Sequence, residues 1–434
     1  MGARILLVLV LWGCGCAAPP DLILVVIDTL RADALPGYGA PPENAPNLAE
    51  LSRESVLFER VVAPSSWTKT SMASLLTATD PSRHGVRGIR HVLPSELPNL
   101  ARVLRDAGYR TLAVQGNPWL RPVFGFDNGF DRYEFQRFRT AAHVNARALE
   151  LLEEAGRERP VFLYLHYMDI HAPYRPARRW FDEPPLVLPE RGPIDDGELE
   201  RRYRHRELRG PDLDRRVRAL YEAELRGLDD ALGELFDALR AQGRLARAVL
   251  VVTSDHGEAF GEHDQVTHGR RLYPEGYAVP LLVHAPGRVP AGVRIDAQVR
   301  SIDVAPTLLA LAGLPREPGF EGEALVPMEA GAIRPRVARS AVGLNDGAPD
   351  QDFAAVVSEE RLYILERRSG AVEFYDLRAD PGARRNLGPE HPEAARFAAL
   401  VAENTPAGVS SWIQIDGALR AELEALGYLD DEAP

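Results

Sequence analysis

Three uninterrupted apolar runs predict strands that are buried on both faces. They are residues 22–27, 161–165 and 248–253. Such runs are typical of parallel sheets, whose strands are covered by helices on both sides. A polar residue follows each run, and these residues are Asp28, His166 and Ser254. Active sites of open α/β sheets lie at the carboxyl ends of the strands, so the pattern predicts a polar site at this edge.

Amphipathic helical patterns separate the apolar runs. The longest covers residues 216–242, and another covers residues 141–154. In the longer pattern, leucines recur at the spacing that places them on one face of a helix. They are Leu220, Leu225, Leu228, Leu232 and Leu235. Strands that alternate with helices predict an α/β fold with a mostly parallel sheet flanked by helices.

The composition changes after Leu314, which predicts a smaller β-rich unit. Residues 361–367 and 371–377 have the pattern of a β-hairpin. Residues 419–429 have the pattern of a terminal helix. We therefore expect a large α/β domain over residues 17–315 and a C-terminal subdomain over residues 316–434.

Residues 178–215 interrupt the large domain and are rich in charge and proline. This composition favours a solvated insertion. Because the segment follows His171 closely, a lid over the site is the alternative interpretation.

The first 16 residues are predicted to be an export signal. The apolar run over residues 5–12 follows Arg4 and is far shorter than the roughly 20 residues of a spanning helix. The segment 11–14 resembles a bacterial lipobox, which favours a lipid on Cys14 and attachment to a membrane surface. We expect a periplasmic protein or a membrane-anchored lipoprotein of a bacterium. A plain signal peptide and a misplaced start codon are the alternatives.

Composition narrows the classes of function. The 434 residues are 45% hydrophobic and 26% charged, as is usual for a globular protein. The net charge of -12 argues against a general nucleic-acid binder, which needs a basic surface. Cys14 and Cys16 are the two cysteines of the chain, so the mature fold has no internal disulfide and no cysteine-rich metal site.

Polar residues at two strand ends form a candidate metal site. Asp28 follows the first apolar run, and Asp255 and His256 follow the third. Two carboxylates and an imidazole suit one divalent cation, with Mn²⁺, Ca²⁺, Mg²⁺ and Zn²⁺ as candidates. Thr68 is a candidate to complete the site, because a metal beside a hydroxyl lowers its pKa for nucleophilic attack. An aspartate at a strand end is often a helix cap, so the prediction depends on the motifs taken together.

Several segments together resemble the sulfatase branch of the alkaline phosphatase superfamily. They are residues 25–33, 65–77, 163–174, 253–258, 268–273, 374–377, 380–381 and 385–387. The resemblance runs from about residue 21 to the C-terminus and implies an alkaline-phosphatase-like catalytic domain that hydrolyses esters with a metal ion. It implies that Asp28, Asp255 and His256 bind the metal and that Thr68 lies between metal and substrate. It also implies that His171 contacts the ester or leaving-group oxygen.

The resemblance further suggests residues that bind the anionic part of a substrate. Sulfatases place a lysine near Arg270, and His268 competes for that role. Many sulfatases have a Gly-Lys-Trp-His segment in their anion pocket, and Asn117 and Trp119 stand here in place of its lysine and histidine. Trp119 could equally be a packed aromatic residue. The candidates for substrate binding are Lys69, Asn117, Trp119, His166 and His268, of which His166 either supports the metal ligands or packs in the core.

Thr68 stands where sulfatases carry the cysteine or serine that is oxidised to formylglycine. In the resembling motif, C-x-P-S-R, the nucleophile lies about nine residues before a Leu-Leu-Thr run, and counting back from Thr77 reaches Thr68. Thr70 and Met72 replace the proline and arginine of the motif. A formylglycine hydrate has two hydroxyls, one of which expels sulfate from the other, whereas threonine has a single hydroxyl. A phosphothreonine, in contrast, is resolved by attack of water or an alcohol at phosphorus.

We therefore expect a metal-dependent hydrolase or transferase with Thr68 as nucleophile, His171 as acid or substrate contact, and Arg270 as an anion-binding residue. Phosphodiesters and phosphonate-type esters are favoured over sulfate esters, on a small molecule, a lipid headgroup or a glycan. A true sulfatase that uses Thr68 differently is one alternative, and a noncatalytic binding relative is another. The acidic cluster counts against the last, because adjacent carboxylates repel each other without a metal.

Overall fold

The computed structural model describes residues 18–137, 140–181, 187–188, 192–193, 201–203, 210–343, 352–402, 412–415 and 417–424. The predicted export signal at residues 1–16, with Cys14, lies outside the described residues. So does most of the 178–215 insertion, and its interpretation as a lid stays a prediction. In the described part of the chain, no helix has both the length and the apolar character needed to cross a membrane.

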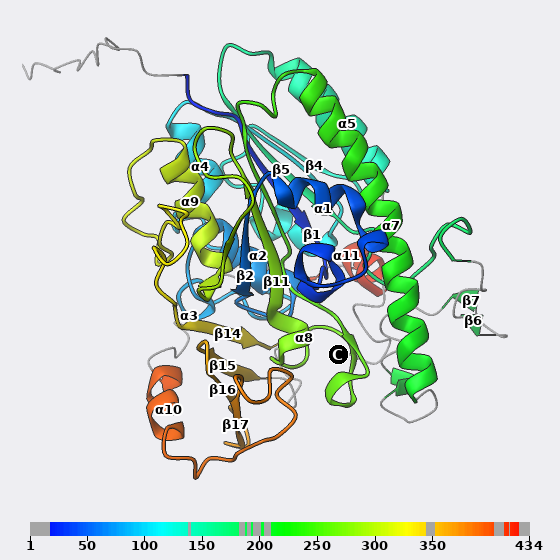
Figure 1. Cartoon of the computed structure of the whole chain (residues 1–434), viewed down its shortest axis with the longest axis vertical. Coiled ribbons are helices and arrows are strands. Elements are labelled where there is room, and N and C mark those ends of the chain that lie inside the picture. The colour runs from blue at the N-terminus through cyan, green and yellow to red at the C-terminus, as the bar shows by residue number, and fades with distance from the viewer. Residues whose placement is uncertain are drawn as a thin grey trace, which may run out of the picture.

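A nine-stranded sheet forms the centre of the described residues (Figure 1). In spatial order it contains β12 (Val293–Ile295), β2 (Val56–Val62), β11 (Ala278–His284), β8 (Val249–Thr253), β1 (Leu22–Ile27), β5 (Val161–Tyr167), β3 (Arg110–Gln115) and β4 (Arg132–Phe135), and β13 (Val299–Arg300) also pairs with β2. β11 is antiparallel to both neighbours, and the other pairs are parallel. The three apolar runs form β1, β5 and β8 in the middle of the sheet, which confirms the predicted α/β class.

Helices cover both faces of the sheet, and alternate residues of β1 point into two separate cores. Ile23, Val25 and Ile27 belong to a core shared with α1 (Pro46–Arg53), α5 (Ala141–Ala155) and α7 (Pro211–Ala241). Leu22, Leu24 and Val26 belong to a core shared with α2 (Thr68–Thr77), α4 (Leu100–Asp106) and α9 (Val304–Leu311). Figure 1 shows α5 and α7 together on one side of the sheet. Full burial of each such aliphatic side chain contributes about 1.5–3 kcal/mol, which favours the two-faced arrangement.

Short elements form the connections around this sheet. They are α3 (Pro81–His84), α8 (Pro274–Tyr277), β6 (Val187–Leu188), β7 (Gly192–Pro193), β9 (Ala259–Phe260), β10 (Val266–Thr267), η1 (Ala32–Ala34), η2 (Pro36–Tyr38), η3 (Pro42–Asn44), η4 (Pro118–Leu120), η5 (Pro122–Phe124), η6 (Glu262–Asp264) and η7 (Ser301–Asp303).

A second, antiparallel sheet follows toward the C-terminus. It contains β14 (Ala338–Val342), β15 (Phe353–Val357), β16 (Arg361–Glu366) and β17 (Val372–Asp376), with α10 (Ala394–Ala402) packed on one face. The predicted hairpin is confirmed as β16 and β17. The sheet is joined to the region before α2, because the Ser340 hydroxyl donates to the Ala63 carbonyl over 2.7 Å. The predicted terminal helix begins as α11 (Gly417–Glu424), and its residues after 424 lie outside the described part.

Candidate active site

The polar residues at the carboxyl ends of β1, β5 and β8 meet at one buried point. Asp28 directly follows β1, His166 lies near the end of β5, and Asp255 follows β8 by two residues. β1 lies between β5 and β8 in parallel register, so the three strands end at the same edge. Thr68 reaches this edge as the first residue of α2. The predicted convergence of Asp28, Asp255 and Thr68 is therefore present.

Hydrogen bonds connect the turn after β1 with the turn after β8 beneath these side chains. The Ser254 hydroxyl accepts a hydrogen bond from the Leu30 backbone and lies 2.7 Å from the carbonyl oxygens of both Ile27 and His256. A side chain at Gly257 would not fit, because its Cβ would lie 2.1 Å from the Glu275 carbonyl oxygen. The Asp-His-Gly order thus places two polar side chains in the site and lets the backbone pass closely behind them.

Asp28 and Asp255 each keep one oxygen aimed at the centre of the site. Asp255 Oδ1 accepts from the backbone amides of His256 (2.8 Å) and Thr29 (3.2 Å). Asp255 Oδ2 and Asp28 Oδ1 are buried and have no hydrogen-bond partner among the described residues. Buried carboxylate oxygens without partners are costly, so this pair favours a bound cation.

His256 presents its Nε2 to the same point. Its Nδ1 lies 2.8 Å from the Gly257 carbonyl, which can only accept, so Nδ1 carries the proton and Nε2 the lone pair. Nε2 lies 3.4 Å from Asp255 Oδ2 and 3.7 Å from Asp28 Oδ1. A cation about 2.0–2.4 Å from each ligand separates neighbouring ligand atoms by roughly 2.8–3.9 Å, and both distances lie in this range, so the donor set fits a divalent ion.

His166 is a further potential ligand, because Asp28, His166 and Asp255 each place one ligand atom within 4.8 Å of the others. However, His166 Nε2 lies 2.9 Å from Asp28 Oδ2, and Nδ1 lies 2.8 Å from the Tyr164 hydroxyl. A carboxylate only accepts, so Nε2 donates to Asp28 and Nδ1 accepts from Tyr164. In this arrangement His166 orients Asp28, and His256 is the better ligand.

Thr68 and Asn117 complete the polar cluster. The Thr68 hydroxyl lies 3.1 Å from His256 Nε2 and 3.4 Å from Asp28 Oδ2. Asn117 follows β3, and its Nδ2 donates to Asp28 Oδ2 over 2.7 Å and approaches Thr68 Oγ1 at 3.4 Å. Asn117 Oδ1 accepts from the Trp119 backbone amide at the start of η4, which fixes the amide orientation. Asn117 thus positions the carboxylate and the hydroxyl together.

Burial and charge separate the pKa values of the two carboxyl groups. Burial and the neighbouring charge of Asp28 raise the pKa of Asp255 to about 6. Burial also opposes ionisation of Asp28, but the hydrogen bond from His166 holds the pKa of Asp28 well below its usual range. Burial lowers the pKa of His256, which keeps the ring neutral, as metal binding requires.

A second group of polar side chains borders the metal ligands. The His268 ring packs against the rings of His256 and His171, with centroids 4.5 Å and 4.9 Å apart. His268 Nδ1 lies 3.3 Å from the buried Glu258 carboxylate, which also accepts from the Tyr174 hydroxyl over 3.2 Å. The predicted residues His171 and His268 therefore lie together at the border of the site.

Lys69 and Trp119 are directed into an aromatic cluster. The Lys69 ammonium donates to the Ile89 carbonyl over 2.7 Å and lies 3.5 Å from the Phe124 ring centroid. The Trp119 ring packs edge-on against Trp67 with centroids 5.5 Å apart. Trp119 is only 2% exposed, so its ring offers little surface to a substrate. The packed-aromatic interpretation fits Trp119 better than substrate binding does.

Arg270 lies on the segment that follows His268. Both residues line a small recess together with Ser66, two positions before Thr68. Arg270 thus lines a recess beside the turn that precedes Thr68.

Sequence reasoning missed the residues that hold the site residues in place. Tyr164 supports His166 from two positions earlier on β5, and the period-two pattern of a strand, which puts them on one face, was the available signal. Glu258 supports His268 across ten residues, and no spacing rule indicates that contact.

The sequence and the fold have counterparts among known proteins. The family model described as Sulfatase matches residues 20–314. The chain belongs to the sulfatase family. A second model, described as N-sulphoglucosamine sulphohydrolase, C-terminal, matches residues 261–403. The ulvan-active sulfatase of Formosa agariphila is 25% identical, over 85% of this chain and 77% of the relative.

Solved structures of two other proteins have a similar fold. BT4656 in complex with its substrate D-glucosamine-2-N,6-O-disulfate matches with a TM-score of 0.73 and 19% identity, covering 95% of this chain and 99% of that chain. A phosphonate monoester hydrolase of Agrobacterium radiobacter matches with a TM-score of 0.70 and 20% identity, covering 93% and 96%. The family model over residues 20–314 makes the chain a hydrolase of the sulfatase family, which belongs to the alkaline phosphatase superfamily and is metal-dependent.

Proposed function

We propose that this sulfatase-family hydrolase cleaves phosphodiesters or phosphonate monoesters with Thr68 as nucleophile. The observation that carries the proposal is the position of the Thr68 hydroxyl, 3.1 Å from His256 Nε2 and 3.4 Å from Asp28 Oδ2. The same point is faced by the two carboxylate oxygens without partners. A hydroxyl placed among metal-ligand atoms, at the first residue of a ten-residue helix, suits attack on an anionic ester.

The residues around Thr68 have separate tasks in this reaction. Asp28, Asp255 and His256 would hold one divalent cation, which when bound lowers the pKa of the Thr68 hydroxyl and neutralises charge on the ester. Asn117 holds Asp28 and Thr68 in register, and His166 donates to the other side of Asp28 Oδ2. These contacts limit the motion of the nucleophile before attack.

The covalent step exchanges the bond between phosphorus and the leaving alcohol for a bond between phosphorus and Thr68. The Thr68 oxygen forms a bond to phosphorus as its proton passes to a solvent water, and the bond between phosphorus and the leaving alcohol breaks. His171 Nδ1 donates to the Ala172 carbonyl over 2.7 Å. In its imidazolium form the ring carries a second proton on Nε2, which is the proposed source of the proton for the leaving oxygen, and solvent then reprotonates the ring. Water then attacks phosphorus, releases the acid product and restores the Thr68 hydroxyl.

The single hydroxyl of Thr68 favours phosphorus over sulfur. A sulfated threonine has no second hydroxyl on the same carbon to expel sulfate, whereas a phosphorylated threonine is open to attack by water. The pocket also suits a singly charged ester, because Asn117 stands beside Asp28 and the Lys69 ammonium contacts the Ile89 carbonyl. Arg270 supplies a cation beside the recess.

Sulfate-ester hydrolysis is the second candidate, and the relatives favour it. The ulvan-active sulfatase and BT4656 with its disulfated glucosamine both bear names that point to sulfated carbohydrates. An anionic ester on a sugar therefore belongs in any substrate search. A noncatalytic role fits less well, because it leaves the buried pair Asp28 and Asp255 without a purpose.

A substrate panel with two variants tests the proposal. The purified protein is assayed on an aryl phosphodiester, an aryl phosphonate and an aryl sulfate, each with Mn²⁺, Mg²⁺, Ca²⁺ or Zn²⁺. We expect turnover of the phosphorus esters and a loss of at least about 10³-fold in Thr68→Ala. Thr77→Ala is the matched control, because Thr77 lies in the same helix and its hydroxyl bonds to the Ala73 carbonyl. Thr68-dependent turnover of the sulfate ester alone would contradict the proposal.

A further inference from the structure

A basic cavity lies at the end of the sheet opposite the active site. It has a volume of about 370 Å³ and is lined by residues that precede three parallel strands. Asp21 precedes β1, Pro160 precedes β5, and Arg247 lies just before β8. The six-residue β1 separates this cavity from Asp28 by on the order of 20 Å. The cavity is therefore separate from the proposed chemistry.

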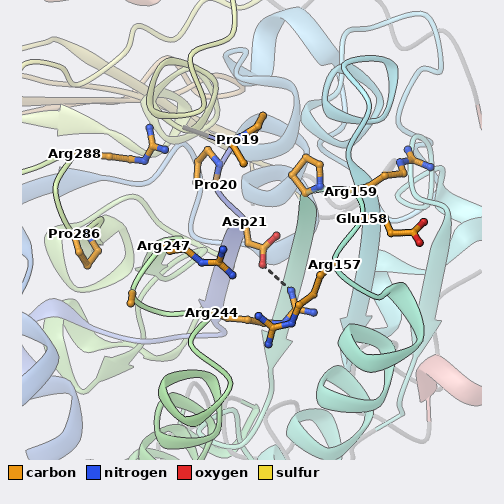
Figure 2. A pocket seen from close by; sticks show the side chains of 13 residues that line it. Pro19, Pro20, Asp21, Arg157, Glu158, Arg159, Arg244, Arg247, Pro286 and Arg288 are labelled. Atoms are coloured by element: carbon orange, nitrogen blue, oxygen red, sulfur yellow. Dashed lines mark hydrogen bonds and ion pairs between the residues drawn. The ribbon is translucent and has the colours of Figure 1, made fainter. Parts of the chain in front are cut away.

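The charge of the cavity contrasts with that of the whole chain. Five arginines line it, against the two carboxylates of Asp21 and Glu158, although the chain carries a net charge of -12. The arginines are Arg157, Arg159, Arg244, Arg247 and Arg288. Figure 2 shows them with Asp21 and Pro20 at the start of β1. A local excess of guanidinium groups on an acidic protein creates a positive field that attracts anions.

Arg244 forms a fixed inner part of this cavity. It is 5% exposed, and it donates to Asp21 Oδ2 over 2.7 Å and to the Leu152 carbonyl over 2.9 Å. Its Nε is buried without a hydrogen-bond partner among the described residues. The contacts with Asp21 and Leu152 fix the Arg244 side chain in the wall of the cavity.

Exposed arginines surround the fixed one. Arg157 donates to the Gln242 carbonyl and Arg288 to the Leu311 carbonyl, and both residues are exposed. Arg247 is exposed beside them. Guanidinium groups match phosphate oxygens with paired hydrogen bonds, so the cavity and its rim suit several phosphate groups on one surface.

We propose that this end of the protein docks on a membrane surface of anionic phospholipids, with a phosphate headgroup in the cavity. The cavity includes Ala18 and Pro19, the first described residues of the chain. The predicted lipid-bearing Cys14 precedes Ala18 by four positions, and four residues span at most about 14 Å, so a lipid on Cys14 would hold this end near a membrane. The active site, at the other end of β1, then faces away from the lipid. The docking does not depend on which ester the site cleaves.

Vesicle binding tests the docking surface. The full chain is sedimented with vesicles of phosphatidylcholine alone and of phosphatidylcholine with phosphatidylglycerol. The neutral vesicles measure the contribution of the apolar run at residues 5–12. We expect tighter binding to the anionic vesicles, weakened by added salt. The triple variant Arg157→Gln, Arg247→Gln and Arg288→Gln should lose on the order of 100-fold in partitioning, about fivefold per arginine.

A second triple variant is the matched control. Arg179→Gln, Arg378→Gln and Arg396→Gln make the same change in charge at exposed positions away from the cavity, and should keep the binding. Both variants should hydrolyse a soluble aryl ester like the parent chain, which verifies folding. Equal binding to neutral and anionic vesicles, or equal losses in both variants, would overturn the proposal. So would thermal stabilisation by inorganic phosphate without vesicle binding, which would indicate a site for a free anion.

Discussion

Replacing Asn117 with leucine removes the amide that links Asp28 to Thr68 while nearly keeping the volume of the side chain. The variant loses the 2.7 Å hydrogen bond to Asp28 Oδ2 and the 3.4 Å contact with Thr68 Oγ1. It also loses the acceptor for the Trp119 amide at the start of η4. A hydrogen bond to a charged group contributes about 1.5–3 kcal/mol, and a cap about 0.5–2 kcal/mol.

These two losses affect different quantities. The cap stabilises the fold alone, so its loss lowers the free energy of unfolding and leaves the catalytic rate unchanged. The bond to Asp28 holds a metal ligand beside the nucleophile, so its loss enters the rate. At 1.36 kcal/mol for each tenfold change, 1.5–3 kcal/mol corresponds to a fall of about 10- to 100-fold in kcat/KM. We expect this fall in Asn117→Leu at saturating metal, measured on the best phosphorus ester of the panel.

Asn47→Leu is the control for this variant. Asn47 donates to Asp229 Oδ2 over 3.0 Å and links α1 to α7, so the same chemical change is made far from the site. It should lower the free energy of unfolding but leave kcat/KM of the folded protein unchanged. A value of kcat/KM within twofold of the parent in Asn117→Leu, or an equal fall in Asn47→Leu, would refute the reasoning.

Three other variants test the metal site and the fold. Asp255→Asn should weaken Mn²⁺ binding, measured by calorimetric titration, by more than about 100-fold, because it removes a charged ligand; an unchanged affinity would count against the ligand set. Tyr164→Phe removes the hydroxyl bonded to His166 and should weaken Mn²⁺ binding by about tenfold. A loss of affinity as large as that in Asp255→Asn would contradict the purely supporting role of Tyr164. Burial lowers the pKa of His84 to about 3, so the folded chain keeps this histidine neutral while the unfolded chain protonates it below about pH 6.5. Between pH 6.5 and 3, the free energy of unfolding should therefore fall more steeply with decreasing pH in the parent than in His84→Gln. The difference in slope should be up to about 1.4 kcal/mol per pH unit. Equal slopes for the two proteins, with the free energy of unfolding measured by denaturant titration at each pH, would disprove this.

The sequence was a good guide to the centre of the fold because burial leaves a simple pattern there. β1 and β8 are buried along their whole length, so they read as uninterrupted apolar runs. Parallel strands end at the same edge, so the meeting of Asp28 with Asp255 followed from topology. The position of Thr68 came from the resemblance of its motif, and the fold brings it to the same point.

Side-chain direction around the site could not be read from the pattern. Lys69 is adjacent to Thr68, yet its ammonium lies on the Phe124 ring, because the turn into α2 sets its direction. Asn117 was expected to bind substrate, and the structure adds a contact that the spacing did not predict: it donates to Asp28, although β3 lies two strands from β1 with β5 between them. These contacts depend on how loops approach each other in space, which the spacing of residues does not encode.

The central claim is that Thr68 forms a covalent bond to phosphorus during turnover. Rapid quenching of the reaction with an aryl phosphonate or phosphodiester, followed by mass spectrometry of the peptide that contains Thr68, measures this directly. We predict a phosphorus adduct on Thr68 that forms at least as fast as steady-state turnover and is absent from Thr68→Ala. Turnover of the phosphorus ester without an adduct at any time, together with full activity in Thr68→Ala, would contradict the account.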